Sequence, residues 1–149
     1  MSGRQFTVAG VFSALEVAGT GLTAERGRMN IIASNLANVH TTRGVDGQPY
    51  HRLDPVFSAE FVERNAPDSV LRNVQGVRLS SVRPDPTPGQ RMYEPGHPDA
   101  DPQGYVEYPN VNVVTEMVNL MTASRAYEAG VTSIESVKAM ARAALRIGG

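Results

Sequence analysis

Proline is confined to the middle of the chain, and this distribution constrains the fold more than any other feature. All ten prolines lie between Pro49 and Pro109, so residues 1–48 and 110–149 contain none. Because proline lacks a backbone N–H and clashes with the preceding helical turn, long helices are expected only at the two ends. The sequence therefore predicts an α+β fold: N- and C-terminal helices pack together as a helical, coiled-coil-like domain, and a small β-rich, loop-rich domain is inserted between them.

The N-terminal segment has the apolar periodicity of one helix face. Steps of three and four residues connect Val8, Phe12, Leu15, Gly19, Leu22, Arg26, Met29, Ala33 and Leu36, and Val11 and Ile32 widen the row. This spacing is typical of an amphipathic helix. Each glycine within the segment costs about 1 kcal/mol relative to alanine, so we expect the helix to be marginal by itself.

The C-terminal segment repeats the pattern more regularly and predicts a longer helix. The same spacing connects Val113, Met117, Leu120, Ser124, Tyr127, Val131, Ile134, Lys138, Ala141 and Leu145. A second row contains Val114, Val118, Met121, Val137, Met140 and Ala144. Asn112 is placed to cap the start of this helix. Two rows are wider than the seam of a two-stranded coiled coil, so we expect the helix to have more than one neighbour.

The middle of the chain predicts short strands joined by turns. Residues 57–61 and 77–79 alternate apolar and polar side chains, and GYVEY at 104–108 has the composition of a strand. The proline- and glycine-rich stretches RPDPTPGQ and EPGHPDADPQG have the chemistry of turns. The predicted division is an N-terminal helical segment at 1–39, a β-rich domain at 40–110 and a C-terminal helix at 111–149.

Composition excludes several classes of function. The net charge of −1 argues against a surface that neutralises nucleic-acid phosphates, and the absence of cysteine removes disulfides and thiolate metal sites. We expect no cleavable signal peptide, because Glu16 directly follows the apolar run after Arg4, and no transmembrane segment. No phosphate-binding loop or common hydrolase motif is present.

Asn35 and Asn38 interrupt the end of the N-terminal helix, where asparagine costs up to roughly 0.7 kcal/mol relative to alanine. Asn38 has two interpretations: it ends the helix in a left-handed conformation, or it faces a neighbouring helix. Asn35 is three residues further inside the helix. We expect it to be a buried amide that fixes the register between packed helices, as a single asparagine does in coiled coils.

The segment GLTAERGRMNIIASNLANVHTT, residues 21–42, resembles the N-terminal signature of flagellar basal-body rod and hook proteins. The residues on the signature positions are Leu22, Ala24, Met29, Ile32, Ala33, Asn35, Leu36, Ala37, Asn38 and Thr41. Residues 93–117 and 119–131, which include PGHPDAD and YPNVNVV, are most similar to the proximal rod proteins within that family. Residues 43–73 are the least diagnostic part.

The resemblance implies a structural subunit of the periplasm-spanning rod, with no catalytic activity and no cofactor. Such a subunit would be exported unfolded and uncleaved by the flagellar type III apparatus, and would assemble into a helical tube. The implied partners are other rod proteins, the membrane-ring and adaptor proteins at the rod base, and the export apparatus. The residues expected at the subunit interface are Leu22, Met29, Ile32, Asn35, Leu36, Asn38, Asn110, Asn112, Met117, Leu120, Met121 and Tyr127.

We therefore expect Asn35→Ala and Leu120→Asp to impair assembly while the strands of the middle domain remain intact. Two alternatives stay open. One is a soluble adaptor that docks by its C-terminal amphipathic helix, which would be monomeric and fully folded. The other is a divalent-metal hydrolase that uses His97, Asp99 and Asp101. The prolines and Gly96 around those three residues favour a rigid turn, in which aspartates bond to backbone amides.

Overall fold

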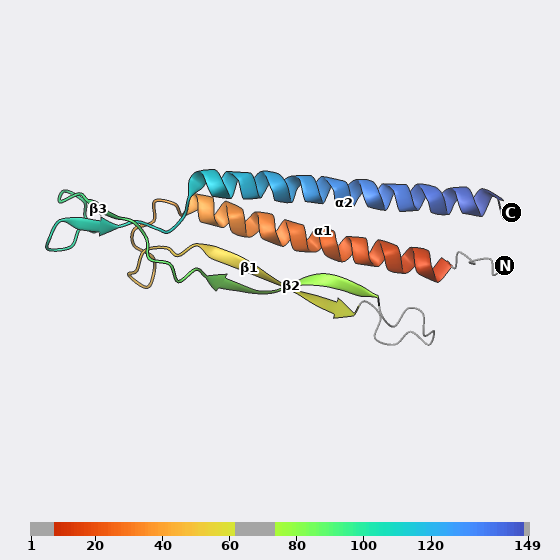
Figure 1. The fold of residues 1–149 in the computed structure, drawn as a ribbon, viewed down its shortest axis with the longest axis horizontal. Helices are drawn as coiled ribbons and strands as arrows, with labels where there is room; N and C mark the ends of the chain where they lie inside the picture. Colours follow the sequence, from red (N-terminus) through yellow and green to blue (C-terminus); the bar gives the residue numbers. More distant parts are fainter. Residues whose placement is uncertain (1–7, 62–73, 148–149) are drawn as a thin grey trace. The chain divides into compact units, whose positions relative to one another are not determined.

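Two long helices and two small sheets make up the computed structural model, which describes residues 8–61 and 74–147. Helix α1 spans Val8–Ala37 and helix α2 spans Val113–Ile147 (Figure 1). Strands β1 (Leu53–Phe61) and β2 (Gln75–Pro84) form one two-stranded sheet, and β3 (Arg91–Tyr93) and β4 (Tyr105–Glu107) form the other. The predicted α+β fold is confirmed: the helices pack together and the sheets lie between them in the sequence.

The chain divides into two compact units. The first contains the described parts of Met1–Gly27, Phe57–Ser80 and Ser124–Gly149, and the second contains Arg28–Val56 and Ser81–Ala123. Each unit therefore takes a length of both helices and of both long strands. The division into segments 1–39, 40–110 and 111–149 stays a prediction, and residues 62–73 of the middle segment lie outside the described residues.

In the first unit α1 contacts both α2 and β2 through close approaches that favour glycine. A Cβ at Gly130 of α2 would lie 2.7 Å from Leu22 Cδ2, and a Cβ at Gly27 would lie 3.2 Å from Leu79 Cδ2. The Thr20 hydroxyl of α1 also accepts a hydrogen bond from the backbone N–H of Val77, at 3.1 Å. The glycines that weaken α1 as an isolated helix thus include one that gives β2 room to approach it.

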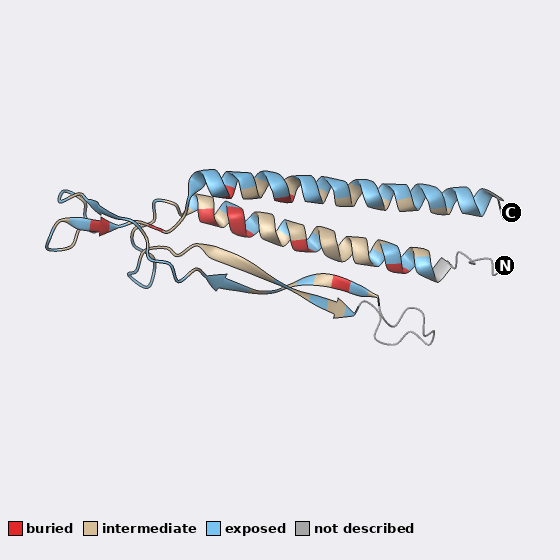
Figure 2. Ribbon diagram, in the orientation of Figure 1, coloured by how far each residue is buried: buried red, intermediate tan, exposed pale blue. Residues whose placement is uncertain are grey.

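The buried face of each helix differs from the predicted seam. On α1, Phe12, Arg26 and Ala33 are exposed. The buried side chains on the described part of α1 are Ser13, Ala24, Ile31, Ile32 and Asn35, of which Ile32 alone was in the predicted row (Figure 2). On α2, Val113, Met117, Lys138 and Leu145 are exposed, and the buried positions are Glu116 and Ala123. The hydrophobic pattern missed these faces because polar side chains with internal partners occupy part of them.

Both predicted caps are present, one by a different mechanism. Asn112 Oδ1 accepts a hydrogen bond from the backbone N–H of Thr115 at 3.0 Å, so Asn112 is the N-cap of α2 as predicted. Asn38 follows the end of α1, and its side-chain amide donates to the Ser34 carbonyl at 2.9 Å. Of the two interpretations of Asn38, the left-handed conformation is wrong, since no non-glycine residue among those described has a positive φ.

The β3–β4 hairpin depends on two glycines. Arg91 pairs with Glu107, and Tyr93 pairs with Tyr105, in antiparallel register. Gly104 precedes β4 with a φ of 85°, a conformation that side chains disfavour. Gly89 precedes β3, and a Cβ there would lie 1.7 Å from the Tyr108 carbonyl oxygen. Strand β3 was not predicted from the sequence, because its three residues are too few to show a period.

Candidate assembly site

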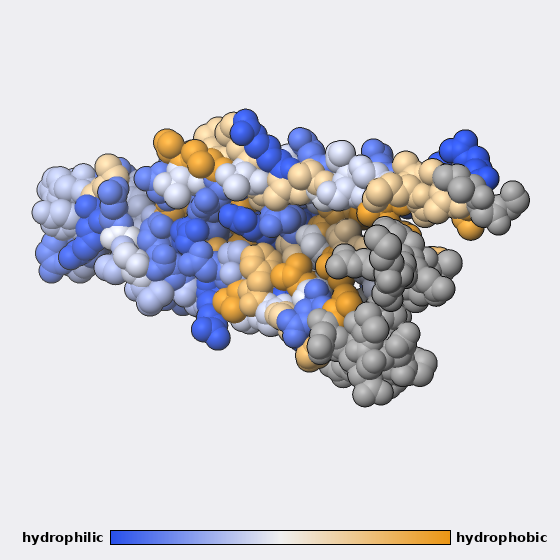
Figure 3. Space-filling view, turned by 45° about the vertical axis from the view of Figure 1, so that its right-hand side comes forward, coloured by the Kyte–Doolittle hydropathy of each residue, from blue (hydrophilic) through white to orange (hydrophobic). Residues whose placement is uncertain are grey.

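An exposed row of apolar side chains covers the outer face of the first turns of α2. We call it the apolar stripe; it consists of Val113, Val114, Met117, Val118 and Met121. Each of these side chains is between 41% and 71% exposed, and an apolar patch is visible over the beginning of α2 in Figure 3. The only charged residue between Val113 and Ala123 is Glu116, which is buried. A contiguous exposed apolar surface of this kind marks an interaction site.

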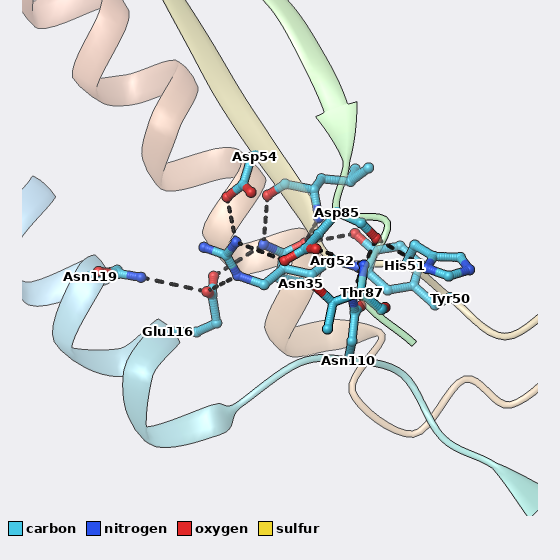
Figure 4. Close-up of polar contacts among 11 residues, drawn as sticks. Asn35, Tyr50, His51, Arg52, Asp54, Asp85, Thr87, Asn110, Glu116 and Asn119 are labelled. Atoms are coloured by element: carbon cyan, nitrogen blue, oxygen red, sulfur yellow. Dashed lines mark hydrogen bonds and ion pairs between the residues drawn. The ribbon is translucent and has the colours of Figure 1, made fainter. Parts of the chain in front are cut away.

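Behind the start of α2 lies a buried to half-buried polar cluster, which we call the joint. It consists of Asn35, Tyr50, Arg52, Asn110 and Glu116, together with the backbone of Leu53 (Figure 4). Its members come from the last turns of α1, the segment that leads into β1, and the first turns of α2 with the residues just before it. All of them belong to the second compact unit.

Asn35 makes four hydrogen bonds within the joint and is 0% exposed. Its side-chain oxygen accepts from the Leu53 backbone N–H and from the Tyr50 hydroxyl, both at 2.9 Å. Its side-chain nitrogen donates to the Leu53 carbonyl at 3.0 Å and to Glu116 Oε2 at 3.1 Å. The amide therefore pairs with Leu53 much as a neighbouring strand would, and its hydrogen-bonding capacity is used inside the chain.

These bonds correct the expectation that Asn35→Ala would leave the strands untouched. Leu53 is the first residue of β1, so loss of the amide removes two bonds at the point where that strand begins. Any part that Asn35 takes in subunit contacts would be indirect, through the arrangement of α1, β1 and α2 that it fixes.

Glu116 is the second fully buried polar side chain of the joint, and Arg52 is its counter-ion. Arg52 Nε lies 2.7 Å from Glu116 Oε1, and the guanidinium also pairs with Asp54. Partial burial of Arg52 disfavours its charge, but the hydrogen bond to Glu116 and the nearby carboxylates outweigh that effect and hold the pKa of Arg52 above its ordinary value. Arg52 therefore presents a positive charge to the Glu116 carboxylate.

Asn110 fixes Arg52 from the other side. Its side-chain oxygen accepts a hydrogen bond from the Arg52 backbone N–H at 2.7 Å, and its nitrogen donates to the carbonyls of Asp85 and Thr87. Thr87 in turn bonds to the Asp85 carboxylate and holds the pKa of Asp85 below its ordinary value. The Asn110 side-chain amide thus connects three segments: the one before β1, the one after β2 and the one before α2.

The structure places the predicted interface residues in three classes. Ile32 and Asn35 are buried, Asn112, Met117 and Met121 are exposed, and the half-buried ones are Leu22, Met29, Leu36, Asn38, Asn110, Leu120 and Tyr127. Asn35 and Asn110 meet in the joint, and Met117 and Met121 lie in the stripe. Leu22 and Tyr127 belong to the first compact unit, whereas the joint and the stripe belong to the second.

Sequence reasoning did not include Tyr50, Arg52 or Glu116 among the site residues. One signal was present: Glu116 lies four residues before Leu120, which places a charge on the same helix face as an apolar seam residue. A charge at such a position requires a partner. The identity of that partner is not readable from local sequence, since Arg52 is 64 positions away.

His97, Asp99 and Asp101 are occupied by contacts within the chain. Asp99 accepts a hydrogen bond from the Thr42 hydroxyl at 2.8 Å and pairs with Arg43 at 3.1 Å. Asp101 Oδ1 accepts two backbone N–H groups of the following turn, as the turn interpretation predicted. Within residues 8–61 and 74–147, no group of three or more His, Cys, Asp or Glu side chains is arranged to hold a metal ion.

Two family models match the chain, and they cover the joint residues Asn35, Asn110 and Glu116 but not the segment at 50–53. The model described as "Flagella basal body rod protein" matches residues 15–43, and "Flagellar basal body rod FlgEFG protein C-terminal" matches residues 103–147. Curated relatives named "Flagellar basal-body rod protein FlgC" extend the similarity to most of the chain. The one from Borreliella burgdorferi is 45% identical over 93% of this chain and 97% of its own length. The chain belongs to the FlgC family of flagellar basal-body rod proteins.

Two other FlgC proteins show the same extent of similarity. The Salmonella typhimurium protein is 42% identical, with 89% of this chain and 94% of the relative covered. The Bacillus subtilis protein is 37% identical, with 92% and 97% covered. As a member of this family, the chain is a structural subunit of the rod in the flagellar basal body and assembles with other flagellar components. Among the described helices, none is both long and apolar enough to cross a bilayer.

Proposed function

We propose that this chain is a non-catalytic rod subunit that polymerises through its terminal helices, with the apolar stripe of α2 as a contact to a neighbouring rod protein. The stripe carries the proposal. Its side chains remain exposed although α2 already packs against α1, and no charge opposes their burial. A surface that differs from the one it contacts on the next subunit gives an open helical assembly, which suits a rod.

The proposal includes the remaining partners that the family implies. These are the membrane-ring and adaptor proteins at the rod base, and the flagellar type III apparatus, by which the chain would be exported unfolded. A non-catalytic role is supported by the contacts that engage both aspartates within the chain: Asp99 with Thr42 and Arg43, and Asp101 with the backbone of its own turn. Export is tested by fractionation of a host strain that lacks the export ATPase, in which the protein should stay in the cytoplasm.

Incorporation into the rod is the direct test. Hook–basal bodies are isolated from the native host after high-salt and detergent washing, and mass spectrometry quantifies this chain against other rod proteins. The variant Val118→Asp places a charge in the stripe without touching the buried face, and we expect it to be lost from the basal bodies. Ser136→Asp is the matched control, because Ser136 is exposed on the same helix face about five turns later.

The outcomes separate the competing interpretations. Presence of the wild-type chain and of Ser136→Asp, with loss of Val118→Asp, supports assembly through the stripe. Loss of both variants would mean that the contact is not confined to the stripe. Absence of the wild-type chain, recovered as a soluble folded monomer, would favour the adaptor instead.

A further inference from the structure

The interface between α1 and α2 contains a buried charge whose counter-ion belongs to neither helix. Glu116 faces α1, where Asn35 donates to its Oε2, and its side chain is 0% exposed. The neutralising guanidinium comes from Arg52, which directly precedes β1. Burial of a carboxylate without its counter-ion is strongly unfavourable, so α2 cannot pack here at low cost unless Arg52 is in place.

Arg52 reaches that position only when several other segments are ordered. Its backbone N–H donates to Asn110, its side chain pairs with Asp54, and the adjacent Leu53 backbone is held on both sides by Asn35. Asn110 is itself fixed by the carbonyls that follow β2. The counter-ion therefore becomes available through folding of the chain around the start of β1 and the end of β2.

Hydrophobic burial offers little alternative drive for helix pairing in this unit. The buried apolar side chains on the described helices here are Ile31, Ile32 and Ala123. Apolar burial of this extent is about cancelled by one unpaired buried charge, so loss of the ion pair removes most of the net drive. Polar pairing, more than apolar area, then decides whether α1 and α2 come together.

We infer that the Arg52–Glu116 pair is an interlock that makes the pairing of α1 with α2 conditional on folding of the strand segments. Because the apolar stripe lies on α2, the interlock also determines when the stripe is presented by a helix that is paired with α1. This role in assembly rests on the function proposed above. A chain whose middle is not yet folded keeps an uncompensated Glu116, so its helices do not pair in the assembly-competent form. The interlock acts as a safeguard against premature association of the helices.

Native-state hydrogen exchange on the full-length purified protein tests the interlock. In the wild type, amides of α1 and α2 within the second unit and the first amides of β1 should exchange through one common opening, with opening constants that agree within about threefold. Arg52→Met should raise all of these opening constants together by at least about 100-fold, because it leaves Glu116 buried and unpaired. Arg43→Met removes the counter-ion of the surface pair with Asp99 and is the matched control, with less than about a fivefold effect.

The double variant Arg52→Met/Glu116→Leu keeps the test decisive if the single variant does not fold. Replacement of a buried ion pair by apolar residues preserves stability in other proteins, so we expect this variant to fold. Its helix amides should stay protected while the β1 amides open at least about 10-fold more often, which separates helix pairing from strand folding. Independent opening of helices and strands in the wild type, or a common opening in the double variant, would overturn the interlock. Hydrogen exchange is measured on the purified chain and needs no assembled rod. A negative result there would refute the interlock alone, whereas the incorporation assay tests the proposed role of the stripe.

Discussion

Replacement of Asn35 by alanine tests whether the joint stabilises the fold as its geometry implies. The change removes four hydrogen bonds from a side chain that is fully buried. Three of them have neutral partners and contribute about 1 kcal/mol each, and the bond to the Glu116 carboxylate contributes about 2 kcal/mol. Alanine regains up to about 0.7 kcal/mol through its better helix propensity. We therefore expect the free energy of unfolding to fall by about 4 kcal/mol.

Asn35→Asp makes the same test more specific. Aspartate nearly preserves the shape of asparagine, but it replaces the donating amide by an acceptor that faces Glu116 Oε2 and the Leu53 carbonyl. Repulsion between these groups at neutral pH should make Asn35→Asp less stable than Asn35→Ala. Asn30→Ala is the matched control, because Asn30 is exposed on the same helix. It should change stability by no more than about 0.7 kcal/mol, in the stabilising direction.

The assay is urea unfolding of the purified chain, followed by far-ultraviolet circular dichroism and checked for two-state behaviour with a second probe. A loss below about 1 kcal/mol for Asn35→Ala would mean that the four bonds add little beyond what water provides. Equal stability of the aspartate and alanine variants would contradict the assignment of the side-chain nitrogen as the donor to Glu116 and Leu53.

Three further predictions concern the turns and caps. Gly89→Ala should destabilise the β3–β4 region, because the new methyl group would collide with the Tyr108 carbonyl, and thermal unfolding will measure the lowered midpoint. Hydrogen bonds from backbone N–H groups, that of Tyr105 foremost, hold the pKa of Asp101 below its ordinary value. Asp101 therefore stabilises the fold above about pH 4, and this contribution is lost as the pH falls through the lowered pKa, as acid titration of the wild type against Asp101→Asn will show. Asn112→Ala should cost about 1 kcal/mol in urea unfolding through loss of the N-cap of α2.

Each of these predictions has an internal control. Gly96→Ala should be tolerated, since nothing lies within 4 Å of a Cβ at Gly96, and equal effects at both glycines would refute the steric argument. If Asp101→Asn leaves the acid dependence of stability unchanged, its carboxylate is not the group responsible. Asn112→Ser retains a capping oxygen and should restore most of the stability that the alanine variant loses.

Features that depend on neighbouring residues were predictable from the sequence. The proline-free ends indicated the two helices, because a proline disrupts the helical turn in which it lies. Asn112 was identifiable as a cap, because the backbone N–H that it caps is three residues away. Asn35 was expected to be buried with a partner, because a polar residue in an apolar run of a helix is costly without one. Of the apolar stripe, Val114, Val118 and Met121 were foreseen as surplus beyond what one helical neighbour would bury, whereas Val113 and Met117 had been placed in the seam.

Features that depend on distant partners were not predictable. Glu116 shares a helix face with the apolar Leu120 and so requires a partner, but no local pattern identifies Arg52 as that partner. The predicted seams were displaced for the same reason, since the hydrophobic period cannot assign an inner face to Ser13 or Glu116. Asn35 was expected to fix the register between helices, but two of its four hydrogen bonds hold the start of a strand, which local sequence does not indicate.

The most direct test of assembly through the apolar stripe is the chemical accessibility of Met121. The chain contains no cysteine, so Met121→Cys introduces a single thiol at an exposed position of the stripe. Its reaction rate with a maleimide is measured in the free purified protein and in isolated hook–basal bodies that contain the variant. Assembly through the stripe predicts at least about a tenfold slower reaction in the basal bodies, because a close-packed interface core excludes solvent. Equal rates in both states, with the variant incorporated at the wild-type level, would contradict it.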